Sequence, residues 1–212
     1  MIIYSLSGHA NDDWILAGDA YMASLLEPDR TNFPCVEIKV GDIIRPVENI
    51  NHQQRISIIG HGKKGLYNHI TANGFVNILK ELGLNDNYTG IIEYFTCYSA
   101  LFRTDPPIMH SLVHLTKNEF PQAIVIGAQG PSIIGPDNIR LTVNPDKLDI
   151  ASQKQQDCIR NCNVDTTRPI NGNILNIGKN IRDNQNVKNF YKQFINELVL
   201  NSCLINGVLV LN

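Results

Sequence analysis

The sequence is short of net charge, of cysteine and of long apolar runs. Its 18 Lys and Arg against 20 Asp and Glu leave a formal net charge of −2, so broad electrostatic attraction to nucleic acid or to an anionic membrane is not expected. No apolar stretch approaches the roughly 18 residues that a transmembrane helix needs. Five cysteines without a regular rhythm indicate reduced thiols rather than a disulfide scaffold. We therefore expect neither nucleic acid nor membrane among the partners.

The first residues also lack the basic stretch that opens a secretory signal peptide. The apolar run at residues 2–6 is short and is followed by Gly8, His9 and Asn11, which is unlike the apolar segment of such a signal. We therefore expect the protein to be cytoplasmic as made. Its 212 residues, 43% of them hydrophobic, suit one domain that buries roughly 70% of its unfolded surface without disulfides or metals.

Five short runs rich in Ile and Val predict buried strands. Each is bounded by Gly, Asn, Pro or Asp, and most are continuous rather than alternating, which favours a parallel sheet covered on both faces. The runs are Ile2–Leu6, Val36–Val40, Ile56–Ile59, Ile91–Phe95 and Ala123–Ile126.

Helical patterns alternate with these runs. They lie at about 11–26, 71–82, 107–115 and 183–200. Strands that alternate with helices form βαβ units, so the sequence predicts an α/β fold with a doubly wound core sheet in residues 1–130 of a single domain, 1–212. The remainder, 131–212, is less regular, with a strand at Ile139–Val143, a polar helix at 146–162, a turn-rich link at 166–173 and a terminal strand at Val208–Leu211.

Reactive side chains follow several of the predicted strands. Ligands of open α/β sheets bind outside the carboxyl ends of the strands, and there the chain has His9, His61, Cys97 and Gln129. A cysteine nucleophile needs an imidazole that takes its proton and returns it to the leaving group. Neighbouring strands lie about 4.8 Å apart, so we expect His61 and Cys97 to meet. Gly62 leaves room for a substrate carbonyl, and its N–H and that of Cys97 are candidate oxyanion donors.

The two sequence blocks around this pair resemble the caspase-like (clan CD) cysteine peptidases. That group includes caspases, legumain, gingipains, separase, clostripain and the self-cleaving domains of large bacterial toxins. The blocks are Ile56–Gly62, which ends in Gly-His-Gly, and Ile91–Ala100, which contains the cysteine. The resemblance implies a three-layer sandwich with a mostly parallel sheet and a protein or peptide substrate. It also implies His61 as catalytic imidazole, Cys97 as nucleophile, and the N–H groups of Gly62 and Cys97 as oxyanion donors.

The chain departs from this family around the nucleophile. The family usually has Ala or Gly where this chain has Thr96, and caspases have Arg-Gly where it has Tyr98-Ser99. The position of Phe95 is polar in caspases and legumain, so the sequence favours an apolar or small P1 residue over Asp or Asn. The loop after the fifth predicted strand lines the specificity pocket of such peptidases and offers two polar side chains here. Substrate binding is therefore assigned to His9, Phe95, Gln129 and Ser132.

Alternatives follow from the same residues. A catalytically inactive binding module on the same sheet is the main one, because Gly-His-Gly is common after strands and cysteines are often buried.

Cys158 and Cys162 lie four residues apart, but no second ligand pair follows, so we expect no metal. The chain lacks the glycine patterns of dinucleotide-binding and α/β-hydrolase sites, and we expect no cofactor. Resemblance to toxin domains leaves open a bacterial effector delivered into another cell and an anionic activator such as an inositol phosphate. No third catalytic residue is assigned, although Ser7 and Asp12 share the sheet edge with His9.

Overall fold

The computed structural model describes residues 1–27, 29, 32–63, 66–101, 111–135, 140–161, 173–205 and 208–212. In chain order the elements are β1 (Ile2–Tyr4), α1 (Ala10–Ser24), β2 (Cys35–Glu37), β3 (Ile56–Ile59), β4 (Gly62–Lys63), β5 (Leu66–Tyr67), β6 (Ile70–Thr71), α2 (Ala72–Glu81), β7 (Ile91–Phe95), α3 (Leu112–Glu119), β8 (Ile124–Ala128), β9 (Ser132–Ile134), β10 (Arg140–Val143), the short 3₁₀ helix η1 (Pro145–Lys147), α4 (Leu148–Asn161), α5 (Ile174–Asp183), α6 (Gln185–Leu200), β11 (Leu204–Ile205) and β12 (Val208–Leu211).

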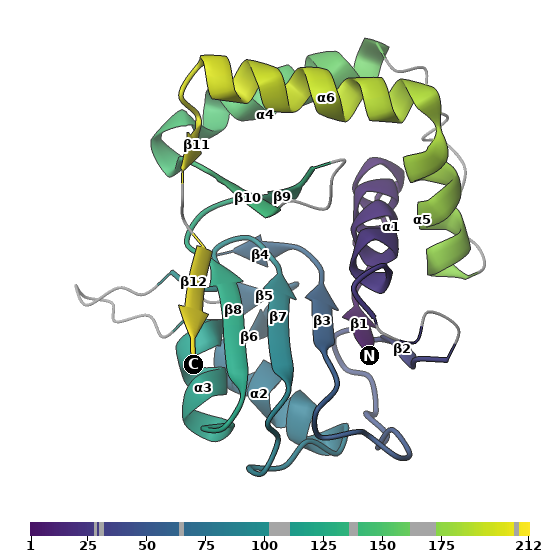
Figure 1. The fold of residues 1–212 in the computed structure, drawn as a ribbon, viewed down its shortest axis with the longest axis vertical. Helices are drawn as coiled ribbons and strands as arrows, with labels where there is room; N and C mark the ends of the chain where they lie inside the picture. The colour runs from purple at the N-terminus through teal and green to yellow at the C-terminus, as the bar shows by residue number, and fades with distance from the viewer. Residues whose placement is uncertain are drawn as a thin grey trace.

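A six-stranded sheet in the order β12-β8-β7-β3-β1-β2 forms the centre of the fold (Figure 1). The strands from β2 to β8 pair in parallel, and β12 pairs antiparallel with β8 at one edge. The predicted α/β fold with a mostly parallel sheet is confirmed. The sheet is not confined to residues 1–130 as predicted, because β12 from the C-terminal part pairs with β8 and completes it. From β1 the chain runs outward to β2 and then returns to β3 on the other side of β1. The strand order therefore reverses between β1 and β3, and doubly wound sheets bind ligands at such a reversal.

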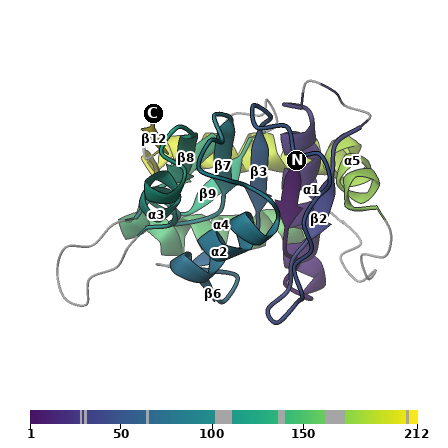
Figure 2. The ribbon, with the colours of Figure 1, turned by 90° about the horizontal axis from the view of Figure 1, so that it is seen from below.

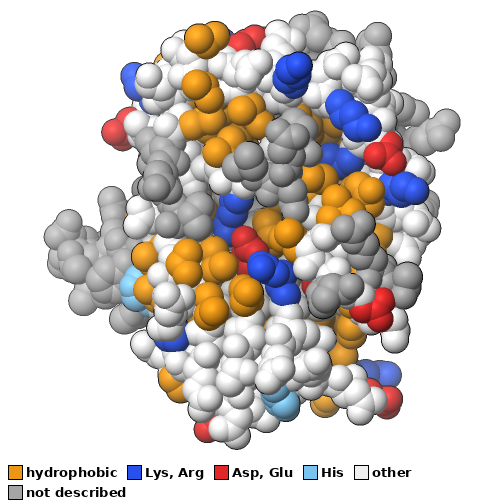
Figure 3. Space-filling view, in the orientation of Figure 1, with side chains coloured by type: hydrophobic (Ala, Val, Ile, Leu, Met, Phe, Trp, Pro, Cys, Tyr) orange, Lys and Arg blue, Asp and Glu red, His pale blue; other side chains and the backbone are white. Residues whose placement is uncertain are grey.

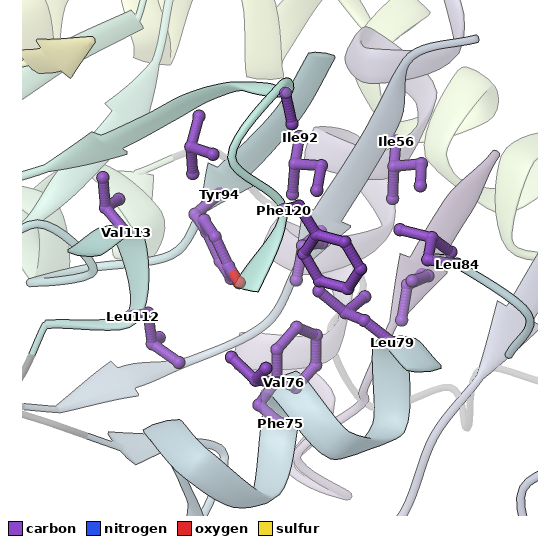
Figure 4. Packing of buried hydrophobic residues seen from close by; sticks show 14 of the residues in the cluster. Ile56, Phe75, Val76, Leu79, Leu84, Ile92, Tyr94, Leu112, Val113 and Phe120 are labelled. Atoms are coloured by element: carbon purple, nitrogen blue, oxygen red, sulfur yellow. The ribbon is translucent and has the colours of Figure 1, made fainter. Parts of the chain in front are cut away.

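Consecutive strand residues point to opposite sides of the sheet and bury two different faces. Ile58 and Tyr94 belong to a core that includes Phe75 of α2 and Phe120 beyond α3 (Figure 4). Ile59 and Phe95, the next residues along β3 and β7, pack instead with Leu16, Ala17 and Ala20 of α1. The continuous apolar runs in the sequence thus follow from burial on both faces.

The C-terminal helices add to the α1 side of the sheet. Helix α5 lies along α1 (Figures 1 and 2), and a Cβ on Gly178 would overlap the carbonyl oxygen of Ala17, so the two helices approach at backbone distance. Helices α4 and α6 lie beyond the carboxyl ends of the parallel strands (Figure 1). Phe190 and Phe194 of α6 share a buried cluster with Trp14 of α1 and Val143 of β10. This packing places β9 and β10 between these helices and the carboxyl ends of the parallel strands.

Charged side chains of both signs are mixed over the described part of the face in Figure 3, without a broad expanse of one sign. This distribution agrees with the small net charge. Among the helices that the structure describes, none is long and apolar enough to cross a membrane.

The predicted elements correspond to observed ones, with differences in extent and, for one strand, in burial. The run Val36–Val40 was predicted to be a buried strand, but β2 lies at the edge of the sheet, and Cys35 and Glu37 are exposed. The third predicted helix appears as α3, and residues 102–110 before it lie outside the described residues, as do 162–172 and Ile139. The best predicted helix, 183–200, is α6, and α5 precedes it where no helix was predicted. The small sheet of β4, β5 and β6 was not predicted either, because strands of two residues are too short to leave a periodic signal.

Candidate active site

Two neighbouring parallel strands bring His61 and Cys97 to the same edge of the sheet. Ile59 of β3 lies opposite Phe95 of β7, and the histidine and the cysteine each follow two residues later. Both side chains line one cavity of about 200 Å³. The structure thus brings together the two residues that the sequence assigns to catalysis.

Gly62 lies against the backbone of Cys97. A Cβ on Gly62 would overlap the carbonyl oxygen of Cys97 and would lie 2.5 Å from the methyl group of Thr96, so a larger residue would push the two strand ends apart. The space next to Gly62 is therefore occupied by the backbone of Cys97, and not by the substrate carbonyl that the sequence suggested.

The amide of Gly62 is directed away from its partner strand. The N–H of Asn68 donates to the His61 carbonyl at 2.8 Å, which makes Gly62 and Tyr67 a non-hydrogen-bonded pair in the β4–β5 ladder. In such a pair the N–H groups point outward from the ladder. This geometry is compatible with the predicted role of Gly62 as an oxyanion donor.

The thiol of Cys97 is enclosed by β9. The N–H of Ser132 donates to Sγ at 3.2 Å, and Sγ lies 3.9 Å from the carbonyl oxygen of the same residue. Burial raises the pKa of the Cys97 thiol, whereas the Ser132 N–H and the positive charge of Arg140 lower it. Because the net shift is upward, the resting side chain is a protonated thiol at neutral pH and needs a base to become a nucleophile.

The backbone directly after Cys97 is strained. Tyr98 adopts a φ of 58°, in the left-handed region that bulky residues rarely occupy. The N–H of Tyr98 donates to the Gly130 carbonyl at 2.9 Å, and that of Ala100 to the Ala128 carbonyl at 2.8 Å. Hydrogen bonds to the segment after β8 therefore hold the turn in place. Strain of this kind clusters at active sites, where the surrounding structure maintains it.

Asp12 of the first turn of α1 faces the imidazole of His61. Its Oδ2 lies 3.7 Å from Nε2, close enough for an ion pair but beyond hydrogen-bond range. Nε2 is shielded from solvent and makes no hydrogen bond within the described part of the chain. Asp12 also lines the cavity. Sequence reasoning placed this residue at the edge without a role, although its position two turns before Asp19 on one face of α1 was a usable signal.

Asp19 is the second carboxylate of the cavity and is buried. Its Oδ1 accepts a hydrogen bond from Nη2 of Arg182 at 2.8 Å, and Arg182 also donates to the Ile134 carbonyl at 3.3 Å. Burial raises the pKa of Asp19 to about 6, although Arg182 opposes that shift. This pair connects α1, α5 and β9 around one side of the cavity.

The remaining walls are mainly apolar. They come from α1, β9, β10, α4 and α6, and they enclose a volume that suits one side chain of a substrate. The apolar lining residues are Ile15, Leu16, Phe95, Pro131, Ile133, Ile134, Val143, Leu148, Ala151, Tyr191 and Phe194.

The four residues assigned to substrate binding separate into two pairs. Phe95 and Ser132 line the cavity. His9 is exposed and caps α1 through its backbone, because its carbonyl accepts from the amides of Asp12 and Asp13 at 2.9 Å. Gln129 is also exposed. Neither His9 nor Gln129 belongs to the cavity lining, so the structure does not bring them to the predicted site.

The structure offers no assembled metal ligands within the described residues, where no group of three His, Cys, Asp or Glu side chains could hold an ion. Cys162 and the side chain of Cys158 lie outside those residues. A larger cavity, about 910 Å³, lies between α1 and α6 and is lined by neither His61 nor Cys97.

Comparison with known proteins adds no relative. No family model matches the chain, and no curated protein matches it either. The functional interpretation of this cavity therefore rests on its own residues and their geometry.

Proposed function

We propose that the chain is a cysteine peptidase of caspase-like fold, or a related acyl-transfer enzyme, acting on a protein or peptide substrate. One observation carries the proposal. His61 and Cys97 leave neighbouring parallel strands at the same level and line one cavity. Helices on both faces of a mostly parallel sheet are what a three-layer caspase-like sandwich requires.

The reaction begins with removal of the Cys97 proton. His61 takes the proton from Sγ, and the sulfur attacks the carbonyl carbon of the scissile peptide, forming a C–S bond and a tetrahedral oxyanion. His61 then gives the proton to the leaving amine as the C–N bond breaks, which leaves a thioester. Water attacks the thioester while His61 takes one of its protons. The C–S bond breaks and the thiol is restored. Another amine in place of water gives acyl transfer.

Two amides are the candidate donors to the oxyanion. Gly62 directs its N–H away from the β4–β5 ladder, and its backbone touches that of Cys97. Two N–H groups on adjacent strand ends stabilise negative charge on one oxygen, and loss of such a donor costs about 10²–10³-fold in rate. The strained turn at Tyr98 supports this assignment, since it fixes the direction of the backbone after the nucleophile.

Asp12 is the candidate third member of the site. Its carboxylate lies 3.7 Å from Nε2 of His61, so Nε2 faces the acid and Nδ1 remains for the proton transfer with sulfur. A carboxylate in this place stabilises the imidazolium that forms during attack and holds the ring in one orientation.

The apolar walls and the cavity volume of about 200 Å³ support a single apolar P1 side chain. No Lys or Arg lines the cavity within the described residues, and its two acids each face a basic partner. The cavity thus offers no free positive charge for an acidic P1 residue.

The test is peptide cleavage with wild type, Cys97→Ala and His61→Ala. A mixed peptide pool is incubated with each protein between pH 5 and 9, and the new termini are identified by mass spectrometry. We expect cleavage after apolar residues by the wild type and none by either variant. Cleavage that persists in Cys97→Ala would contradict the proposal. So would the absence of cleavage, if Cys97 also labels with a peptidyl electrophile no faster than exposed Cys35.

A non-catalytic binding module is the second candidate, and one observation favours it. The thiol already accepts a hydrogen bond from the backbone of β9, and burial raises its pKa, as in a structural cysteine. This candidate predicts that peptides bind at the cavity without turnover and that His61→Ala leaves the labelling rate of Cys97 unchanged.

A further inference from the structure

Arg140 makes an unusual set of contacts beneath the nucleophile. It is the first residue of β10, and its side chain is only 7% exposed. Nη2 donates to the carbonyl of Tyr94, and Nε donates to Oγ of Ser132 at 3.1 Å. The guanidinium also lies over the ring of Phe95, 5.4 Å from its centre. The guanidinium is thus bound both to the strand that leads to Cys97 and to the residue whose amide contacts Sγ.

Arg140 shares its counter-charge with a second arginine. Glu93 of β7 faces two guanidinium groups, because Arg55 pairs with Oε2 and Arg140 lies 3.5 Å from Oε1. The side chain of Arg55 is 22% exposed and is partly solvated, whereas that of Arg140 is 7% exposed. The nearby carboxylate of Asp19 is engaged by Arg182. Among the described residues, Arg140 is therefore a buried cation whose one ion-pair partner is shared.

The Nη1 atom of Arg140 is buried and lies 3.5 Å from Oε1 of Glu93, at the outer limit of hydrogen-bond distance. Burial lowers the pKa of the Arg140 guanidinium, while the negative charges of Glu93, Cys97 and Asp19 raise it. At neutral pH the Cys97 thiol is protonated, so its negative charge arises only when a base removes that proton. A thiolate at Cys97 then adds a second negative charge near Arg140.

We propose that Arg140 is a positioning residue that stabilises the Cys97 thiolate, by its charge and by holding Ser132 against Sγ. The inference rests on the proposed function in one respect, that the thiolate is the nucleophile. When the proton of Sγ passes to His61, the new negative charge faces Arg140 and the Ser132 N–H. The other ionisable groups near the sulfur are His61 of the same cavity, Asp19 and Tyr98. The negative charge of Asp19 opposes the thiolate, whereas the Tyr98 phenol, whose pKa is raised, is uncharged at neutral pH.

The test is the pH dependence of Cys97 alkylation by iodoacetamide, followed site by site by mass spectrometry between pH 6 and 10. Arg140→Met removes the charge and keeps much of the bulk. We expect its alkylation curve to move upward by about one pH unit or more, which is about a tenfold slower rate at neutral pH. Arg140→Lys retains a cation without the planar geometry and is expected to lie between the two. Exposed Cys35 and buried Cys203 in the same chain are internal references.

Glu93→Gln separates an electrostatic role from a structural one. It keeps the shape of the side chain and removes the competing negative charge, so the alkylation curve should move downward, opposite to Arg140→Met. A purely structural role predicts the same direction for both variants, and that result would overturn the inference. An unchanged curve in Arg140→Met, with the fold intact by near-ultraviolet circular dichroism, would overturn it as well. If Arg140→Met does not fold, opposite shifts in Arg140→Lys and Glu93→Gln support the inference, and shifts of one sign contradict it.

The result is independent of peptidase activity, because iodoacetamide needs only a thiolate. If Arg140→Met slows alkylation but the peptide pool is never cleaved, the proposed function fails and the role of Arg140 stands. If cleavage depends on His61 and Cys97 while alkylation ignores Arg140, the reverse holds.

Discussion

The two faces of β7 have opposite characters. On one face, Ile92 and Tyr94 are fully buried against the cluster that includes Phe75 of α2. On the other face, Glu93 and Phe95 lead to Cys97 and meet two arginines and a cavity. A strand of five residues thus holds the core together on one side and supports the candidate site on the other. Residues that stabilise the core therefore alternate along β7 with residues that serve the candidate site, and each set can be substituted separately.

The largest expected effect comes from the site face. Cys97→Ala and His61→Ala should each lower peptide cleavage by about 10³-fold or more, because each removes the nucleophile or its base. Their free energies of unfolding should stay within about 1 kcal/mol of wild type, since small changes at such positions remove little packing. Urea denaturation and the cleavage assay measure the two quantities. If these variants lost activity only because they unfold, the site face of β7 would contribute to stability as the core face does, and the two faces would not differ.

A substitution in the core on the other side of the sheet should lower stability without changing the reactivity of the candidate site. Phe75→Ala empties the centre of a cluster in which Phe75 is fully buried beside the rings of Tyr67 and Tyr94. We expect a loss of about 3–5 kcal/mol in the free energy of unfolding. In the fraction that remains folded, the alkylation rate of Cys97 should be unchanged. A specific loss of thiol reactivity without loss of stability would contradict the separation.

Asp19 should give the protein a pH-dependent stability. Its pKa is about 6 in the folded state and near 4 in the unfolded chain, so the native state binds the proton more tightly. As pH rises from about 4 to about 6, unfolding becomes easier by about 3 kcal/mol, and the contribution is constant above that range. Urea denaturation across this pH range should show the fall in wild type. Asp19→Asn has no proton to lose and should flatten it, whereas an identical slope in both proteins would refute the assignment.

Asp12→Asn should have the smallest effect of the four. The amide removes the charge that faces Nε2 of His61 but leaves the nucleophile and the base in place. We expect kcat to fall by about tenfold, with KM changed little, because the imidazolium loses its partner only as it forms. Asp13→Asn is an unsuitable control, since Asp13 orders the turn after β1 through the amides of Ser7 and Gly8. Asp86, which is exposed and distant along the chain, is the better one.

The sheet was predictable from the sequence, and the surroundings of its edge were not. Four of the five apolar runs are nearly continuous because their strands are buried on both faces, whereas the run of the edge strand β2 alternates, and Cys35 and Glu37 are exposed. Strand order and register place His61 beside Cys97, which a doubly wound topology allows in advance. Glu93 was visible as the single charge inside a buried run, but its partner Arg140 lies 47 residues later in a region without clear periodicity. Contacts of that kind depend on how loops fold back, and short-range patterns do not specify them.

The same limit explains the mixed outcome for the substrate-binding residues. Phe95 lines the cavity because the alternation of β7 fixes its direction. His9 and Gln129 lie after strands too, but each follows a turn whose direction the sequence left open, and both side chains are exposed. The other walls come from α1, β9, β10, α4 and α6. Of these, β9, β10 and α4 belong to the part of the chain with a weak periodic signal, whereas α1 and α6 were predicted as helices without any indication that they face the cavity.

The contact between Gly62 and the backbone of Cys97 has a consequence for how this site tolerates change. A side chain in conflict with its neighbour has other rotamers, but the conflict at residue 62 would involve a Cβ and a carbonyl group, and neither has a torsion of its own to relieve it. Substitutions elsewhere in the cavity adjust reactivity by degrees. At residue 62 any side chain would force the ends of β3 and β7 apart, so a sequence that keeps their present spacing also keeps this glycine.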